Sequence, residues 1–226
     1  ASQHSGSMPF APFVPLRVLS SYSMLEGAID PKAIAKLAKE RGFPAIAICD
    51  RNGLYGIMAF AAGCKSEGVQ PLIGALLGVA REGVEGSGAR AIDYLPLLAQ
   101  DEEGYGNLCH LVSQAHLDRP LELDPHVTLA DLEGRTGGLI ALTGAGEGGL
   151  TRLLADGQHE AAAKLADRLQ ALFPHRLYVE LARNGDPVCE RAEEALIDLA
   201  YNRDLPLVAT NPANFAEPHM HKAHDA

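Results

Sequence analysis

The sequence predicts a parallel α/β fold, and three observations lead to this prediction. Short apolar runs alternate with amphipathic segments of helical length along the chain. Most neighbouring runs are separated by enough residues for the helical crossover that parallel strands require. Several runs are followed directly by polar residues, and parallel α/β folds bind ligands at the carboxyl ends of their strands. Periodicity alone leaves both a barrel and an open doubly wound sheet available.

The first βαβ unit is predicted within residues 13–56. Residues 13–19 form an apolar run with β-branched members, which predicts a buried strand. Asp30 is a helix cap, Gly42 ends that helix, and residues 45–49 predict the next strand. Polar residues gather at the carboxyl ends of the two strands: Arg17, Ser20 and Ser21 at the first and Asp50, Arg51 and Asn52 at the second.

The next elements depart from simple alternation. Residues 54–67 have a helical pattern that ends at Gly68. Residues 69–80 and 91–99 are apolar runs separated only by a loop over residues 82–90. Because that loop is too short for a helical crossover, we expect an antiparallel hairpin or an extra ribbon at the sheet edge.

The second half of the chain returns to alternating helices and strands. Thr128 can cap a short helical turn after the helix that Asp101 begins. The predicted helices cover residues 101–116, 150–155 and 160–173 and a segment that starts at Asp186; the predicted strands cover residues 138–143, 176–181 and 207–211.

Composition limits the domain organisation and the partners. A chain of 226 residues is long enough for one large core, so we expect a single domain over residues 8–226, with residues 1–7 derived from expression. The net charge of −10 and the lack of a basic run argue against direct binding of duplex DNA. The four cysteines form no CxxC pair, and no apolar run is long enough to span a membrane, so a cytoplasmic protein is expected.

Three local patterns suggest chemistry, and each has a plainer explanation that we prefer. The turn GAGEGG after residue 143 could bind a nucleotide, but it lacks the order and the lysine of phosphate loops, so a flexible connection is favoured. Cys49 could be a nucleophile, but no neighbouring histidine is identifiable, and a buried thiol is the usual case. His219, His221 and His224 could chelate a metal, but a solvated tail is favoured.

Several stretches, taken together and in order, resemble one known family. They are FVPLRVLSSYSMLEGA, FPAIAICDRNGLYG, VQPLIGA, EEGYGNLCHLVSQA, GLIALTG, RLYVELARNG and LPLVATNPANF. They resemble the polymerase and histidinol phosphatase (PHP) domain at the N-terminus of the bacterial DNA polymerase III alpha subunit, in its alphaproteobacterial form. The resemblance implies a distorted seven-stranded (β/α) barrel at the start of a much longer chain.

The resemblance also implies where this chain departs from a metal-binding site. Members with an intact site hold metals at the carboxyl ends of the barrel strands, mostly through histidines and carboxylates. Of that set Asp50 remains here, and Glu180 is a further acid of the same pocket. Proline, leucine and arginine side chains do not bind divalent metals, so we expect no metal and no catalytic residue in this chain. The predicted vestigial pocket consists of Pro15, Arg17, Leu19, Asp50, Arg51, Leu76, Glu180, Asn184, Pro212 and Asn214.

Two arginines can replace the positive charge that absent metals leave. A guanidinium binds carboxylates through paired hydrogen bonds, so we expect Arg17 and Arg51 to pair with Asp50 or Glu180. The alternative is that both arginines point into solvent.

For function, the resemblance implies a non-catalytic domain of a replicative DNA-directed DNA polymerase, a nucleotidyltransferase that uses magnesium elsewhere in its chain. The expected roles are bracing the polymerase and docking the proofreading exonuclease subunit among other polymerase III holoenzyme subunits, with DNA bound through the parent chain and no membrane contact. One alternative is a metal-dependent phosphoesterase or 3′–5′ exonuclease of the same superfamily. Another is a free-standing PHP-like protein.

Overall fold

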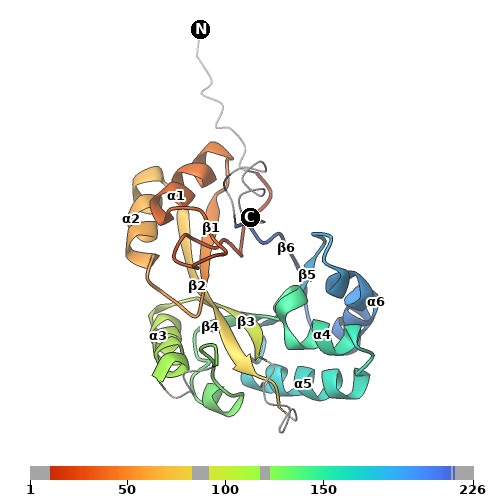
Figure 1. The fold of residues 1–226 in the computed structure, drawn as a ribbon. Helices are drawn as coiled ribbons and strands as arrows, with labels where there is room; N and C mark the ends of the chain where they lie inside the picture. The colour runs from red at the N-terminus through yellow and green to blue at the C-terminus, as the bar shows by residue number, and fades with distance from the viewer. Residues whose placement is uncertain (1–10, 83–91, 118–122, 215, 217–226) are drawn as a thin grey trace.

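A computed structural model describes residues 11–82, 92–117, 123–214 and 216, and it shows one curled six-stranded sheet with helices packed around it (Figure 1). The strands follow the order β1-β2-β3-β4-β5-β6, so every strand lies beside its neighbour in sequence. The predictions for residues 1–7, for most of the loop at 82–90 and for the three histidines after residue 218 concern residues outside the described part.

The first helix and strand confirm the prediction from sequence. Helix α1 spans Pro31–Glu40, and the Asp30 carboxylate accepts a hydrogen bond from the backbone N–H of Lys32 at 2.9 Å. Gly42 follows the helix with a φ of +70°, which glycine adopts without steric cost. Strand β1 spans Ala45–Arg51, two residues longer than predicted.

The predicted strand over residues 13–19 is wrong, because only isolated bridges form there. Val18 bridges to Ala213 beyond the last strand, while the carbonyls of Pro15 and Val18 accept hydrogen bonds from β1 at 2.8 and 2.9 Å. Pro15 has no N–H to donate, which limits a continuous ladder. The segment nevertheless lies between the two edges of the sheet and joins them, in the place of a seventh barrel strand.

The central hairpin is confirmed, but the alternative that placed it at a sheet edge is wrong. Strand β2 (Gln70–Ala80) pairs in parallel with β1 and antiparallel with β3 (Ile92–Ala99), so both strands lie inside the sheet. Helix α2 (Ile57–Glu67) begins three residues later than predicted, because residues 54–56 form a turn before it. Gly68 ends that helix in the left-handed conformation, as predicted.

The second half of the chain forms the helices and strands that the sequence predicts, with the predicted ends shifted by at most two residues, and it adds the turn η2 where a flexible connection was expected. Strand β4 pairs antiparallel with β3 and parallel with β5, and β5 pairs in parallel with β6. The elements are α3 (Glu102–Leu117), the 3-10 turn η1 (Ala130–Leu132), β4 (Leu139–Leu142), the 3-10 turn η2 (Ala145–Glu147), α4 (Gly149–Ala155), α5 (His159–Leu172), β5 (Leu177–Ala182), α6 (Pro187–Asn202) and β6 (Leu207–Thr210).

Two hydrophobic clusters hold the helices to the sheet. The larger one joins β2, β3, β4 and β5 to α3, α4, α5 and α6, and the smaller one joins β1 to α1 and α2. Within the described residues no helix is long and apolar enough to cross a membrane. The curl of the sheet brings the carboxyl ends of β1, β4, β5 and β6 toward one another, and polar side chains meet there.

Candidate functional site

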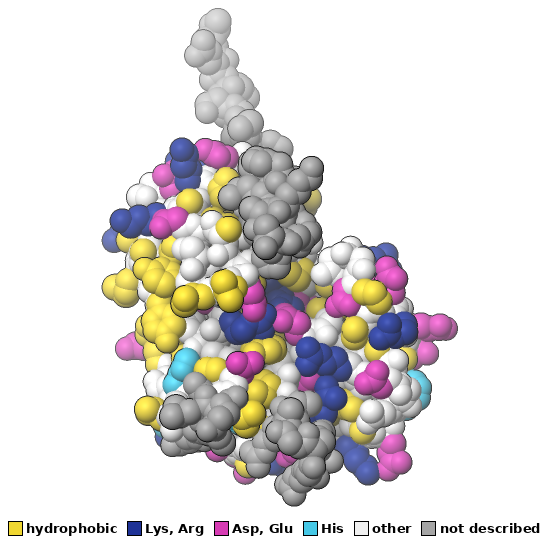
Figure 2. Space-filling view, viewed as in Figure 1, with side chains coloured by type: hydrophobic (Ala, Val, Ile, Leu, Met, Phe, Trp, Pro, Cys, Tyr) yellow, Lys and Arg dark blue, Asp and Glu magenta, His cyan; other side chains and the backbone are white. Residues whose placement is uncertain are grey.

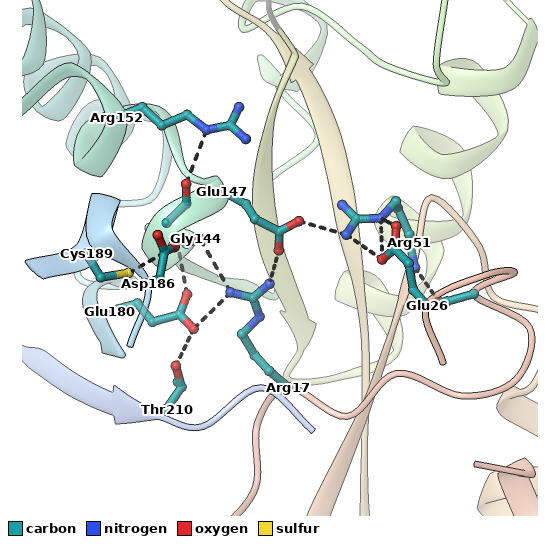
Figure 3. A network of polar contacts seen from close by, with 12 residues as sticks. Arg17, Glu26, Arg51, Gly144, Glu147, Arg152, Glu180, Asp186, Cys189 and Thr210 are labelled. Atoms are coloured by element: carbon teal, nitrogen blue, oxygen red, sulfur yellow. Dashed lines mark hydrogen bonds and ion pairs between the residues drawn. The ribbon is translucent and has the colours of Figure 1, made fainter. Parts of the chain in front are cut away.

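A cavity of about 200 Å³ lies where the carboxyl ends of the strands converge. Its wall combines two arginines and three carboxylates with small and apolar residues. Figure 3 shows the polar members of this wall and the contacts between them. The lining residues are Arg17, Leu19, Glu26, Cys49, Arg51, Leu76, Ala145, Gly146, Glu147, Asn184, Asp186, Pro212 and Asn214.

Most residues of the predicted pocket do meet at this cavity. Glu180 is fully buried and contacts the cavity through Arg17, whereas Pro15 and Asp50 are buried outside the lining. The predicted residues that line the cavity are Arg17, Leu19, Arg51, Leu76, Asn184, Pro212 and Asn214. Whether the pocket is the remnant of a metal site stays a prediction.

Arg17 is the buried cation of the site, with a side chain only 4% exposed. Its Nη2 donates to the Glu147 carboxylate at 2.7 Å, and its Nη1 lies 3.3 Å from the carboxylate of Glu180. Burial opposes the charge of the guanidinium, but the negative charges of Glu180 and Glu147 outweigh it and raise the pKa of Arg17. The guanidinium therefore stays charged, and the predicted pairing of Arg17 with Glu180 is present.

Glu147 joins the two arginines through its two carboxylate oxygens. One oxygen accepts from Arg17, and the other accepts from Nη2 of Arg51 at 2.7 Å. Arg51 also donates to Glu26 from Nε and Nη2 at 2.9 and 2.6 Å, and it lies 4.1 Å above the ring of Tyr94. Burial alone would raise the pKa of Glu147. The positive charges of Arg51 and, to a smaller extent, of Arg17 outweigh this effect, so the pKa of Glu147 is lowered from its usual value.

Glu180 is the buried anion of the site and holds the loop that carries Glu147. One carboxylate oxygen accepts from the backbone N–H of Gly144 at 3.0 Å, and the other accepts from the hydroxyl of Thr210. Gly144 has a φ of +91°, and a Cβ there would lie 2.2 Å from the carbonyl oxygen of Tyr94. Only glycine fits this close approach, so the turn that the sequence suggested to be a flexible connection is fixed in position.

Asp50 forms a separate, arginine-free cluster, so the predicted pairing of Arg51 with Asp50 or Glu180 is wrong. Its carboxylate accepts from the N–H and hydroxyl of Ser20, both at 2.6 Å, and from the hydroxyl of Ser23 at 2.8 Å. Successive side chains of a strand point to opposite faces, which is why neighbouring Asp50 and Arg51 cannot share one partner set. Hydrogen bonds from Ser20 and Ser23 thus stabilise the Asp50 carboxylate, for which an arginine partner was expected.

The donor set of the cavity does not fit a metal cluster. Divalent metals bind several carboxylates, imidazoles or thiolates that converge on one point. Here the carboxylates of Glu26 and Glu147 face guanidinium groups, and the described residues contain no group of three or more His, Cys, Asp or Glu arranged to hold a metal. We therefore assign no metal to the mechanism of this site.

Cys49 lines the cavity but is a poor nucleophile. Burial raises the pKa of its thiol to about 12, and the positive charge of Arg17 only partly offsets that effect. The thiol therefore stays protonated at neutral pH, as expected for a buried hydrophobic cysteine.

Three acids that complete the site were not predicted from the sequence. Glu147 lies in the glycine-rich turn after β4, Asp186 caps α6 after β5, and Glu26 lies in the loop before α1. The signal for Glu147 was its position, because it is the one charged residue of a turn that follows a predicted parallel strand. Glu26 carries no such signal, since its partner Arg51 is 25 positions away.

Comparison with known proteins gives a family and a set of relatives. A sequence profile of the PHP domain matches residues 15–184. The DNA polymerase III subunit alpha of Caulobacter vibrioides is 44% identical over 219 residues, which cover 95% of this chain and 19% of that protein. The subunits of Rickettsia bellii and Pseudomonas aeruginosa are 35% and 30% identical over 213 residues each, 94% of this chain and 18% of each of those proteins. The chain thus spans about a fifth of the length of these curated relatives.

Solved structures agree on the fold. A candidate metal-dependent phosphoesterase of Bifidobacterium adolescentis superposes with a TM-score of 0.58 at 14% identity, covering 91% of this chain and 89% of that one. An amidohydrolase of Chromobacterium violaceum gives a TM-score of 0.56 at 15% identity, covering 89% of this chain and 87% of that one. At such low identity the likeness concerns the fold alone, and it confirms the predicted distorted barrel.

Proposed function

The chain belongs to the PHP domain family, and from this premise we propose that it is the N-terminal domain of a DNA polymerase III alpha subunit. Relatives that carry this name match almost the whole chain at 30–44% identity. The proposed parent protein is a cytoplasmic, magnesium-dependent DNA polymerase of DNA replication, with its nucleotidyl-transfer chemistry outside these residues.

Within that parent we propose a structural, non-catalytic role for this domain. The observation that carries the proposal is the ion-pair chain Glu26–Arg51–Glu147–Arg17–Glu180, which crosses the cavity at the carboxyl ends of the strands. Arg17 and Glu26 lie before α1, and Arg51 is the last residue of β1. Glu147 lies in the turn after β4, and Glu180 lies in β5 (Figure 3). An ion-pair chain of this kind ties together segments distant in sequence, and it pairs the carboxylates of Glu26, Glu147 and Glu180 with guanidinium groups.

The proposed partners are the proofreading exonuclease subunit and other holoenzyme subunits. The net charge of −10 supports contacts with proteins over contacts with the phosphates of DNA. In this view DNA binds to the rest of the parent chain, while this domain braces the polymerase and docks the exonuclease.

Two measurements test the proposed function. Metal analysis of the untagged protein, combined with a phosphodiesterase assay in the presence of manganese or zinc, should give neither stoichiometric metal nor turnover. Turnover that is lost in Arg17→Met, with the fold intact, would show instead that the cavity is an active site. Co-purification with the exonuclease subunit encoded in the same genome tests docking, and failure of the folded chain to associate would leave only the bracing role.

A further inference from the structure

Five large apolar side chains that are near one another in sequence or in space are exposed, and none of them lines the cavity. They come from the loop before α1 and from the start of α2, and the rings of Tyr22 and Tyr55 lie 6.4 Å apart between centroids. Leu25 is 94% exposed and Met24 83%, far beyond what folding alone favours for such side chains. Figure 2 shows hydrophobic side chains gathered in this region. We define the Tyr22 surface as Tyr22, Met24, Leu25, Tyr55 and Met58.

The loop of the Tyr22 surface is anchored on both sides of its tip. On one side the Ser23 hydroxyl donates to Asp50 and accepts from the backbone N–H of Arg51; on the other side Glu26 pairs with Arg51. Between these anchors Leu25 has a φ of +69°, a left-handed conformation that costs a bulky residue about 1–2 kcal/mol. The anchors therefore hold an unfavourable backbone that presents an apolar side chain to solvent.

This arrangement reduces the entropic cost of binding. A loop already fixed in its binding conformation loses little freedom when a partner docks, so more of the contact energy appears as affinity. Aromatic and methionine side chains are also enriched at the centre of protein contacts, and tyrosines are among the residues that supply most of the binding energy there.

Charge around the Tyr22 surface differs from the charge of the whole chain. Helices α1 and α2, which pack against each other, carry four of the six lysines of the sequence and only two acids, Glu40 and Glu67, whereas the chain as a whole carries −10. Lys32, Lys36 and Glu67 line a shallow groove between these helices together with Ala59 and Ala62, and Lys36 lies 3.8 Å from the carboxylate of Glu40. The groove adjoins the Tyr22 surface, because Met58 lies one helical turn before Ala62 on the same face of α2.

We propose that the Tyr22 surface and the groove between α1 and α2 dock a segment of a partner protein whose apolar side chains are flanked by carboxylates. The exposed apolar side chains select bulky apolar residues, and the two lysines at the groove select negative charge. A second copy of this chain would bring the same lysines and is disfavoured by like charge. This docking surface goes beyond the proposed function, since it depends on no identity of the partner.

The test is a selection from random peptides displayed on phage against the 226-residue chain. We expect enriched peptides that combine bulky apolar residues with Asp or Glu, and binding that weakens as salt is raised. The dissociation constant of an enriched synthetic peptide is then measured by calorimetry for the native chain and for variants.

Matched variants separate the surface from non-specific binding. Met24→Ser combined with Leu25→Asn should weaken the peptide about tenfold or more, because asparagine keeps the left-handed backbone and removes the apolar side chain. Lys32→Glu with Lys36→Glu should weaken it and reduce its salt dependence. The controls are Tyr201→Asn, an equally exposed apolar residue on α6, and Lys164→Glu on α5; both should leave affinity unchanged.

Four results would overturn the proposal, each in a different way. The first is no enrichment, or enrichment of basic peptides. The second is binding that survives the double variant of Met24 and Leu25. The third is a dimer in sedimentation that the same variant abolishes, which would assign the surface to a second copy. The fourth is binding to phosphatidylglycerol vesicles that this variant abolishes, which would assign it to lipid. None of these results bears on association with the exonuclease subunit, so the proposed function is tested separately.

Discussion

Replacing Glu147 with glutamine tests whether the cavity is held together by charge. Glutamine keeps the size of the side chain but removes the negative charge that faces Arg17 and Arg51, each at 2.7 Å. We expect the variant to fold and to be less stable than the native chain. Without the carboxylate, the positive charges of the two guanidinium groups are less well neutralised in a poorly hydrated site.

The size of the loss follows from burial. Removing one partner of a fully buried ion pair costs about 3–5 kcal/mol, whereas an exposed pair contributes about 0–1 kcal/mol. Arg17 is 4% exposed, Arg51 20% and Glu147 35%, so the site lies between these limits, and screening by solvent reduces the upper value. We expect a loss of about 2 kcal/mol, which for a domain of this size lowers Tm by about 4–8 °C.

The sign of the pH dependence follows from the lowered pKa of Glu147. A carboxyl whose pKa is lower in the folded than in the unfolded state stabilises the fold above its unfolded pKa of about 4.3, and that contribution is lost as pH falls through the folded pKa. The difference between native chain and Glu147→Gln should therefore be constant from pH 7 to about pH 5 and shrink below about pH 4.

Urea denaturation at several pH values measures both effects. Glu133→Gln is the matched control, because Glu133 pairs with Arg168 where both side chains are exposed, and it should cost less than about 0.5 kcal/mol. Equal losses for the two variants, or a Glu147→Gln loss that persists unchanged to pH 3, would refute the electrostatic account of the site.

The remaining predictions concern the turn, the thiol and the serine cluster. Gly144→Ala should lose more than about 2 kcal/mol in urea denaturation, because the added Cβ meets the Tyr94 carbonyl at a positive φ, whereas Gly106→Ala in α3, where a Cβ meets nothing, should gain up to about 1 kcal/mol. Iodoacetamide at pH 8 should leave Cys49 unmodified in the folded chain and modify it in urea, as mass spectrometry of its tryptic peptide would show; modification of the folded chain would contradict the buried, protonated thiol. Asp50→Asn should cost about 2–3 kcal/mol and speed hydrogen exchange in residues 20–27, because an amide nitrogen cannot accept the serine hydrogen bonds; unchanged exchange there would contradict the anchoring role.

The sequence predicted the fold where local signals were strong. Asp30 and Gly42 correctly predicted where α1 begins and ends. The short spacing between two apolar runs correctly predicted the β2–β3 hairpin. The failure at residues 13–19 has a physical cause, because an apolar run predicts burial but not continuous pairing, and Pro15 limits the ladder. The hairpin was predicted without its position in the sheet, which depends on pairings between segments far apart in sequence.

The site was predicted in its location better than in its contacts. The rule that polar groups gather at the carboxyl ends of parallel strands placed Arg17 and Arg51 at the cavity, and that placement is correct. Their partners were partly wrong, because the turn after β4 brings Glu147 between the two arginines. That approach depends on the φ of Gly144 and on its hydrogen bond to Glu180, which no spacing in the sequence reveals.

The residues after β1 connect the cavity to the Tyr22 surface. Asp50 points to one face and holds Ser20 and Ser23, while Arg51 points to the other and holds Glu26 and Glu147. The loop that presents Leu25 is therefore fixed by one residue from each face of the same strand. This anchoring requires the buried carboxylate of Asp50 and the paired guanidinium of Arg51. It requires neither a metal nor a change of protonation. Ion pairing in the cavity and presentation of the apolar loop are thus two consequences of one set of contacts, and loss of either anchor should release the strain stored at Leu25.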